Sequence, residues 1–415
     1  MKEYQSFIED LKSTIKSHAI VAAAEWKNQA ILSVNGLAAE KLRGLVPLEI
    51  RRASGAFFTS SELGARVLKS QKLKFGKEII FYDPACGAGN LLIAAQKEYA
   101  AVSAKNKLEA CFTGTDIHDE FVEACKIRLG INDLLLNRAS CDYGNMIVNA
   151  DGLEDNFYYK AATHVLTNPP FNLIDSPHGL TWASGKVSAA ALFVDAIVKY
   201  CKPGTQVVAI LPDVLRSGSR YEKWRQLISR TCDLTNIELW GQFDEFADVD
   251  VFSVLFTIKA EPSAVGEKCW TSKVAGHKTI SDSFTVCVGP VVDNRDEHEG
   301  TERPYIVSRG LPGWQEVSQF NRKRKHKGVS FISPFVVVKR TSRRGDNHRA
   351  IATIIKSKTP VYVDNHLIVL IPISGKLKDC KALLKSLKRN ATDKWIDTQI
   401  RCRHLTVKVV SNIPL

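Results

Sequence analysis

Residues 78–90 read EIIFYDPACGAGN, an apolar run that leads directly into a loop with two glycines. The run from Glu78 to Tyr82 has the length and composition of a buried parallel strand, and residues 91–101 after the loop have a helical pattern. A strand, a glycine loop and a helix in this order are typical of folds whose backbone comes close to a ligand at the carboxyl end of the strand. A tight turn without a ligand would have the same local sequence, so other segments have to decide between the two.

Three further apolar segments lead into polar residues, as the first strand does at Asp83. They are residues 111–115, followed by Asp116 and Ile117; residues 146–149, followed by Ala150, Asp151 and Gly152; and residues 163–167, followed by Asn168. Parallel strands of this kind open at one edge of the sheet, so we expect these side chains around one cofactor crevice. At a strand tip Asp116 would accept hydrogen bonds from ribose hydroxyls, and the alternative is a solvated cap of the next helix.

The tetrapeptide Asn168-Pro169-Pro170-Phe171 has the groups needed to act on an exocyclic amine such as that of adenine. The ring withdraws the lone pair of this amine, and an Asn oxygen with the next backbone carbonyl can accept its two hydrogens and free the pair for attack. The prolines fix the loop and remove its donors, while the aromatic ring can stack on a base turned out of a duplex. The alternative is an ordinary turn, because Asn and Pro are common turn residues.

Three segments, in this order, resemble the S-adenosylmethionine-dependent N6-adenine DNA methyltransferases of the γ arrangement, the restriction-modification type. They are Ser54-Gly55-Ala56-Phe57-Phe58-Thr59, the loop from Asp83 to Gly89, and Asn168 to Phe171. The family usually has proline after the threonine of the first segment, where this chain has Ser60. The resemblance covers about residues 50–260.

The resemblance implies S-adenosyl-L-methionine as the cofactor and a flipped adenine of double-stranded DNA as the target. The residues carried over by position are Thr59, Asp83, Gly87 and Gly89 around the methionine moiety; Asp116 and Ile117 at the ribose and adenine of the cofactor; Asp151 and Gly152 at its adenine amine; Asn168, Pro169, Pro170 and Phe171 as the catalytic loop; and Phe246 as a second aromatic for the target base. The reaction needs no metal, because the sulfonium already carries an activated methyl group.

The predicted fold class is α/β, with a Rossmann-like methyltransferase sheet that is mostly parallel and a separate C-terminal α+β target-recognition domain. We expect an N-terminal helical segment at residues 1–50, the methyltransferase domain at 51–265 and the target-recognition domain at 270–415. In the last of these the patterns predict strands at 331–338, 351–355 and 366–371 and helices at 378–389 and 391–401.

Positive charge is concentrated in the C-terminal third of the chain. The 415 residues carry a formal net charge of +13, and residues 270–415 hold 27 Lys and Arg against 12 Asp and Glu. Such asymmetry is expected of a domain that binds a polyanion, although charge runs are also common in solvated loops. The residues predicted to contact DNA are Arg322, Lys323, Arg324, Lys325, Arg340, Arg343, Arg344, Asn347 and Arg349.

The remaining features set broad bounds on the class of protein. Ten cysteines occur without a Cys-x-x-Cys pair, and no apolar run approaches the length of a membrane span, so we expect a bacterial cytoplasmic enzyme with reduced thiols and no metal site. The expected partners are double-stranded DNA and a cognate restriction endonuclease or specificity subunit. Two alternatives remain: an RNA base methyltransferase, and a catalytically silent DNA-binding module on the same fold.

Overall fold

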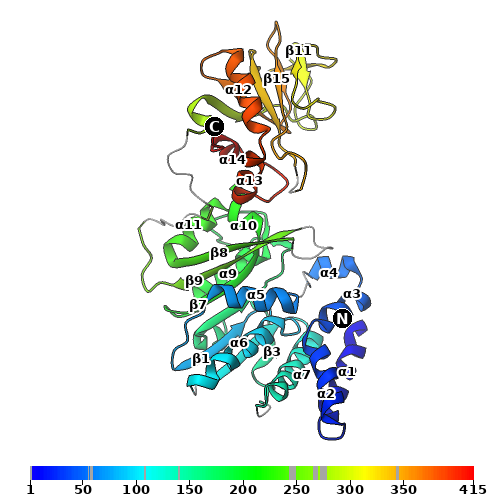
Figure 1. Ribbon diagram of the computed structural model, residues 1–415. Coiled ribbons are helices and arrows are strands. Elements are labelled where there is room, and N and C mark those ends of the chain that lie inside the picture. Colours follow the sequence, from blue (N-terminus) through cyan, green and yellow to red (C-terminus); the bar gives the residue numbers. More distant parts are fainter. Residues whose placement is uncertain are drawn as a thin grey trace. The chain divides into compact units, whose positions relative to one another are not determined.

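The computed structural model describes residues 2–54, 56, 59–106, 109–138, 141–242, 249–264, 270–271, 278–342 and 345–415. The chain divides into two compact units, which Figure 1 shows in the colours of the sequence. Unit 1 comprises Met1–Leu215 and Arg220–Lys268, and unit 2 comprises Arg216–Ser219 and Cys269–Leu415.

Unit 1 is built around a seven-stranded sheet with the order β3-β2-β1-β4-β7-β9-β8. Its strands are β1 (Glu78–Asp83), β2 (Glu109–Asp116), β3 (Ile147–Asn149), β4 (His164–Thr167), β7 (Gln206–Pro212), β8 (Cys232–Gln242) and β9 (Asp250–Ile258). The first five run parallel to one another, and β9 is antiparallel to both β7 and β8. The prediction of an α/β fold with a mostly parallel sheet is therefore confirmed.

The strand order changes direction between β1 and β4. From β1 the chain proceeds outward through β2 and β3, and β4 then pairs on the other side of β1. In open sheets of this kind the loops after the strands leave a crevice at such a switch point. The two strands that border this point are the ones that carry the glycine loop and the Asn-Pro-Pro-Phe loop.

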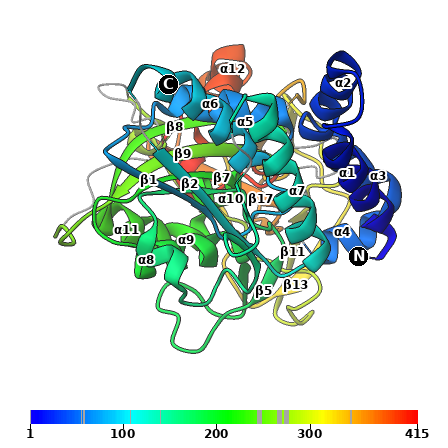
Figure 2. The same ribbon diagram turned by 90° about the horizontal axis from the view of Figure 1, so that it is seen from below.

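Helices cover both faces of this sheet (Figure 2), as the near-continuous apolar strands require. On one face lie α5 (Ser61–Gln71), α6 (Asn90–Asn106) and α7 (Asp119–Leu135), and on the other lie α8 (Phe157–Ala161), α9 (Ala189–Tyr200) and α11 (Glu222–Thr231). A short hairpin of β5 (Leu173–Asp175) and β6 (Lys186–Ser188) follows the Asn-Pro-Pro-Phe loop, and α10 (Asp213–Ser217) follows β7.

The N-terminal helices share the core of unit 1. These are α1 (Gln5–Ser17), α2 (Ala23–Val34), α3 (Leu37–Leu45) and α4 (Leu48–Ser54), of which α1 and α2 pack against α7. Tyr4, Phe7 and Trp26 are buried in the same cluster of apolar side chains as strand β1. Their polar atoms are also satisfied: the Tyr4 hydroxyl donates to the Ala38 carbonyl at 3.1 Å and the Trp26 Nε1 donates to the Thr14 carbonyl at 2.9 Å.

Unit 2 is an α+β arrangement around a five-stranded sheet with the order β10-β17-β14-β15-β12, beside a three-stranded sheet with the order β13-β11-β16. Its elements are β10 (Phe284–Val288), β11 (Thr301–Ile306), β12 (Glu316–Val317), β13 (Lys323–His326), β14 (Phe335–Lys339), β15 (Ala352–Ile355), β16 (Tyr362–Val363), β17 (Leu367–Pro372), α12 (Leu377–Leu387), α13 (Asn390–Gln399) and α14 (Val407–Ser411). Side chains alternate along β14: Val336 and Val338 join the core under the helices, while Phe335 and Val337 join a second core on the other face.

Candidate functional site

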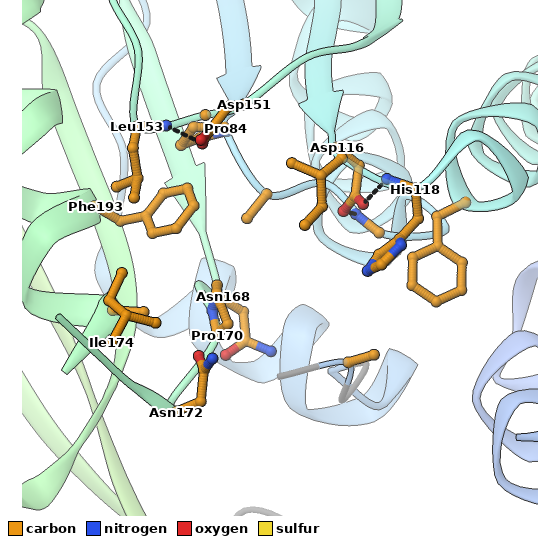
Figure 3. A pocket seen from close by; sticks show the side chains of 17 residues that line it. Pro84, Asp116, His118, Asp151, Leu153, Asn168, Pro170, Asn172, Ile174 and Phe193 are labelled. Carbon is orange, nitrogen blue, oxygen red and sulfur yellow. Dashed lines mark hydrogen bonds between the residues drawn. The ribbon is translucent and has the colours of Figure 1, made fainter. Parts of the chain in front are cut away.

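A pocket lies at the carboxyl ends of the central strands of unit 1, where the topology predicts a crevice. It is lined by Pro84, Ala85 and Gly87 after β1, Asp116 and Ile117 at the end of β2, Asp151 and Gly152 after β3, and Asn168 and Pro170 after β4. Figure 3 shows Asp116, Asp151 and Asn168 around the same cavity, each carried by a different strand. Side chains far apart in the sequence are therefore assembled by the parallel order of the strands.

The glycines in and beside the pocket stand where a side chain would be strained or would clash. Gly87 and Gly89 have φ angles of 51° and 82°, in the left-handed region that glycine adopts readily. A Cβ on Gly152 would lie 1.9 Å from the carbonyl oxygen of Pro84 and 2.8 Å from a ring carbon of Phe193. The backbone after β3 therefore passes directly against the loop after β1, and this contact closes one wall of the pocket.

Two carboxylates, that of the buried Asp83 and that of the half-buried Asp116, accept hydrogen bonds from the glycine loop. The Asp116 carboxylate accepts from the backbone N–H of Gly87 and from that of His118, both at 2.9 Å, and Asp83 accepts from the backbone N–H of Ala85 at 3.1 Å. Burial raises the pKa of Asp83 well above its ordinary value, against the opposing effect of the Ala85 hydrogen bond. Burial also raises the pKa of Asp116, and its backbone hydrogen bonds offset part of that shift. A cation bound nearby would therefore favour the ionised form of both carboxyl groups.

The Asn-Pro-Pro-Phe loop leaves β4, whose four residues are all buried. Asn168 and Pro170 are half-buried and line the pocket, while Pro169 is buried. Phe171 is half-buried, packs against the hydrophobic core of unit 1 and does not line this pocket, so its stacking on a base stays a prediction. Asn172 and Ile174, the next residues toward β5, do line it.

Thr59 is 3% exposed, and its backbone carbonyl accepts a hydrogen bond from the side-chain amide of Asn90 at the start of α6. This bond ties the segment before α5 to the glycine loop. Ala56 of the same segment lines the pocket. Gly55, Phe57 and Phe58 lie outside the described residues, as does Phe246, the expected second aromatic for the target base.

Sequence reasoning missed several residues that line the pocket. His118 and Phe121 come from the start of α7, and Phe193 comes from α9 on the other face of the sheet. His118 and Phe121 pack edge to face with ring centroids 5.2 Å apart. The sequence did hold a signal for His118, because it directly follows Asp116 and Ile117, which were predicted to bind the cofactor. None existed for Phe193, whose helix reaches the pocket only through packing.

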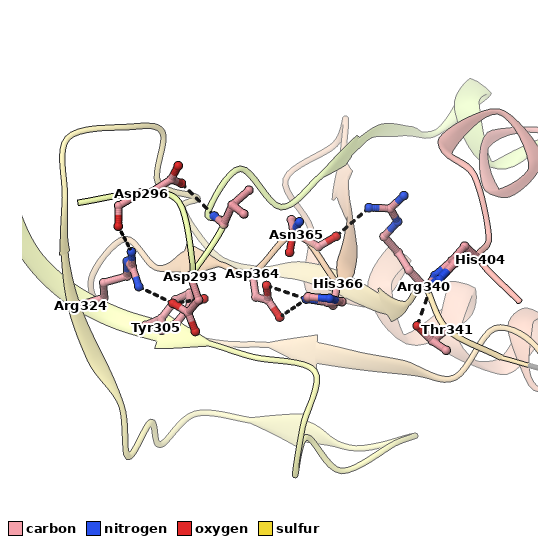
Figure 4. A network of polar contacts seen from close by, with 11 residues as sticks. Asp293, Asp296, Tyr305, Arg324, Arg340, Thr341, Asp364, Asn365, His366 and His404 are labelled. Carbon is pink, nitrogen blue, oxygen red and sulfur yellow. Dashed lines mark hydrogen bonds and ion pairs between the residues drawn. The ribbon is translucent and has the colours of Figure 1, made fainter. Parts of the chain in front are cut away.

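The first basic cluster of unit 2 forms the strand β13, and its side chains alternate between solvent and the interior. Lys323 and Lys325 are exposed, as is Arg322 just before the strand. Arg324 is 3% exposed and forms an ion pair with Asp293, as Figure 4 shows. The expectation that Arg324 contacts DNA is therefore corrected: its guanidinium is buried in the fold and cannot reach a phosphate.

The second cluster divides in the same way. Arg349 is 1% exposed, with its guanidinium paired to Asp397 on α13 and donating to the Cys402 carbonyl at 3.1 Å, so it too is corrected from a DNA contact to a buried structural residue. Arg340 is half-buried and donates to the Asn365 carbonyl at 2.8 Å, whereas Asn347 is exposed. Arg343 and Arg344 lie outside the described residues.

The described residues offer neither a metal-binding cluster nor a membrane-spanning helix. No group of three or more His, Cys, Asp or Glu side chains is arranged there to hold a metal ion. No helix in the same part of the chain has the length and apolar character needed to cross a bilayer.

Comparison with known proteins gives a match to one family model and several structural similarities. No curated protein matches the sequence significantly. Among solved structures, similarity is found to a Listeria monocytogenes protein described as a candidate class I S-adenosylmethionine-dependent methyltransferase, at 16% identity and TM-score 0.41, covering 63% of this chain and 91% of that one. The type IIG restriction endonuclease BpuSI is similar at 14% identity and TM-score 0.49, covering 91% of this chain and 60% of that one. The M protein of the type I restriction enzyme EcoKI is similar at 16% identity and TM-score 0.37, covering 64% of this chain and 69% of that one.

A family model described as N-6 DNA Methylase matches residues 48–239, a range that includes every residue lining the pocket.

Proposed function

We propose that this chain is an S-adenosylmethionine-dependent DNA methyltransferase that acts on the N6 amine of a flipped adenine. The observation that carries the proposal is the meeting of Asn168 with Asp116 and Asp151 in one pocket, at the carboxyl ends of three strands. The description of the family model that matches residues 48–239 agrees with it.

The pocket residues fit the proposed cofactor. The glycine loop brings backbone close to the cavity, and the contact of Gly152 with Pro84 leaves room only for a residue without a side chain. Asp116 is suited to ribose hydroxyls and Asp151 to an adenine amine, with the exposed Ile117 against the adenine face. When bound, the cofactor supplies a methyl group activated by the positive sulfonium.

The role of the Asn-Pro-Pro loop is to position the target amine and change its electronic character. The Asn168 side-chain oxygen and the Pro169 carbonyl would accept the two amine hydrogens, which favours a tetrahedral nitrogen with a free lone pair. Phe171 packs against the core and does not line the pocket, whereas Phe193 and Pro170 do, so these two also offer apolar surface for the base. Alignment of amine, methyl and sulfur then supplies the remaining catalysis.

Unit 2 is the proposed DNA-binding part, through the exposed residues Arg322, Lys323, Lys325 and Asn347 and the half-buried Arg340. We propose that the enzyme works in a bacterial cytoplasm together with a restriction endonuclease or specificity subunit. The positive charge of residues 270–415 supports DNA, a polyanion, as a partner.

The proposal is tested by methyl transfer from labelled S-adenosylmethionine to duplex DNA of varied sequence. We expect label in N6-methyladenine after hydrolysis of the DNA and none in RNA. Label in RNA alone would favour the RNA methyltransferase alternative. Binding of DNA without transfer to any nucleic acid would favour the silent binding module.

Cofactor affinity is expected to fall as the pH is lowered. The fall should begin at a higher pH than the one at which an ordinary carboxyl group is protonated. Burial raises the pKa of Asp83 and of Asp116, and a bound sulfonium and ammonium favour the ionised carboxylates, so protonation opposes binding. Calorimetric titrations with S-adenosylmethionine across acidic to neutral pH, with folding checked by circular dichroism, measure this. The Asp83→Asn variant should bind more weakly at neutral pH and lose part of the pH dependence; an affinity independent of pH in the folded protein contradicts the argument.

A further inference from the structure

Arg128 is a fully buried arginine in the middle of α7, with no exposed surface. Its Nε donates to the backbone carbonyl of Ser33 in α2 at 2.8 Å. Its Nη1 donates to the backbone carbonyl of Ala88 and, at 2.7 Å, to the side-chain oxygen of Asn90. One guanidinium thus contacts an N-terminal helix, the glycine loop and the start of α6.

No carboxylate of the described residues pairs with the positive charge of Arg128. Among the residues that the structure describes, its hydrogen-bond acceptors are the two carbonyls and the amide oxygen, and its Nη2 has no partner. Burial lowers the pKa of the guanidinium, with the Tyr4 and Cys125 side chains as the groups that oppose the shift. A buried charge that is stabilised only by dipoles costs free energy, so the fold depends on each hydrogen bond that the guanidinium makes.

The acceptors of Arg128 belong to the backbone that forms the pocket wall. Ala88 lies between Gly87 and Gly89, and the N–H of Gly87 donates to Asp116 at 2.9 Å. The loop is therefore held from two sides: its Gly87 N–H donates to the Asp116 carboxylate, and its Ala88 carbonyl accepts from Arg128.

Asn90 extends this arrangement to the segment before α5. Its side-chain oxygen accepts from Arg128, and its side-chain nitrogen donates to the carbonyl of Thr59. A short chain of hydrogen bonds thus runs from Ser33 through Arg128 and Asn90 to Thr59, and both of its ends are backbone carbonyls. Displacing the guanidinium would free the glycine loop and this segment together.

We propose that Arg128 is a positioning residue of the cofactor site, and that through it the N-terminal helices become part of the structure that binds S-adenosylmethionine. Arg128 holds the Ala88 carbonyl at a fixed place relative to α2, so the geometry of the glycine loop depends on how residues 5–34 are packed. This inference rests on the proposed function, because it takes the pocket to be the cofactor site.

The test compares Arg128→Met and Arg128→Lys in the full chain. We expect Arg128→Met to weaken the binding of S-adenosylmethionine and S-adenosylhomocysteine about ten- to a hundredfold, because hydrogen bonds from a charged donor to the loop are lost. The KM for S-adenosylmethionine should rise by a similar factor, with kcat and the KM for DNA much less affected. Lysine keeps the charge but reaches fewer acceptors, so the cofactor affinity of Arg128→Lys should lie between those of wild type and Arg128→Met.

A matched control separates positioning from a general loss of stability. Gln96 on α6 is also fully buried, and its side chain donates to the Tyr143 hydroxyl at 2.8 Å, in the same layer of helices but without a bond to the glycine loop. Gln96→Leu should lower the melting temperature and leave cofactor affinity unchanged at temperatures where it is folded. Unchanged affinity in folded Arg128→Met would overturn the inference, whereas a wild-type chain that binds neither probe would instead refute the proposed function.

Discussion

Replacing Asn168 with Ala is expected to slow methyl transfer about 100- to 1,000-fold, the usual effect of removing one preorganised group that acts on the reacting centre. The side chain stands at the end of β4 in the pocket wall, and in the proposed mechanism its oxygen is needed only as the amine moves toward tetrahedral geometry. Cofactor affinity should change little, because the residues proposed to hold the cofactor follow β1, β2 and β3. Single-turnover rates with saturating DNA, beside calorimetric titration with S-adenosylmethionine, measure the two effects separately.

Two variants serve as controls for Asn168→Ala. Asn168→Asp keeps an acceptor oxygen in the same position and should retain more activity than the alanine variant. Asn156→Ala removes an amide that caps α8, where its oxygen accepts from the Tyr159 N–H at 3.2 Å, and should affect stability without slowing the single-turnover rate. Equal rates for wild type and Asn168→Ala would show that the loop is a structural turn.

The architecture of unit 1 was largely predictable because its signals are local. Each central strand is a short apolar run, and each run ends in an aspartate, asparagine or glycine that cannot continue a buried strand. Once the strands are parallel, topology alone brings these ends together, which is why Asp116, Asp151 and Asn168 meet in one pocket.

Features set by long-range packing were not predictable. Phe171 follows two prolines at the edge of the crevice, and nothing local decides whether its ring faces the cavity or the core. Phe193 reaches the pocket from a helix on the far face of the sheet. Nothing local in the sequence marks Arg128 as buried, because two of its partners lie 95 and 40 positions away along the chain.

The basic residues of unit 2 show the same limit. Charge in a sequence suggests exposure, but a strand sends alternate side chains to opposite sides. Arg324 therefore faces the interior, toward Asp293, which lies 31 positions earlier in the chain. The cluster of residues 322–327 is in consequence one exposed row with a buried arginine inside it.

Neutralising the exposed row with Arg322→Gln, Lys323→Gln and Lys325→Gln together is expected to produce the second large effect, a loss of DNA affinity that is greatest at low salt. Each phosphate contact contributes about 0.9 to the slope of log K against log salt concentration, so losing three contacts should flatten the slope by up to about 2.7. Fluorescence anisotropy with a labelled duplex at several salt concentrations measures the slope. Methyl transfer should fall through a higher KM for DNA, with the affinity for S-adenosylmethionine unchanged.

Arg324→Gln is the matched control for this triple variant, because it removes one charge from the same strand but from its buried side. It breaks the pair with Asp293 and the hydrogen bond to the Asp296 carbonyl, so the melting temperature should fall while the salt slope of the folded protein stays that of wild type. A triple variant with the wild-type slope would place the DNA contacts elsewhere in unit 2. A flatter slope for Arg324→Gln in the folded state would mean that the buried arginine, too, shapes the surface that meets the phosphates, and the division of β13 into two faces would then fail as an account of DNA binding.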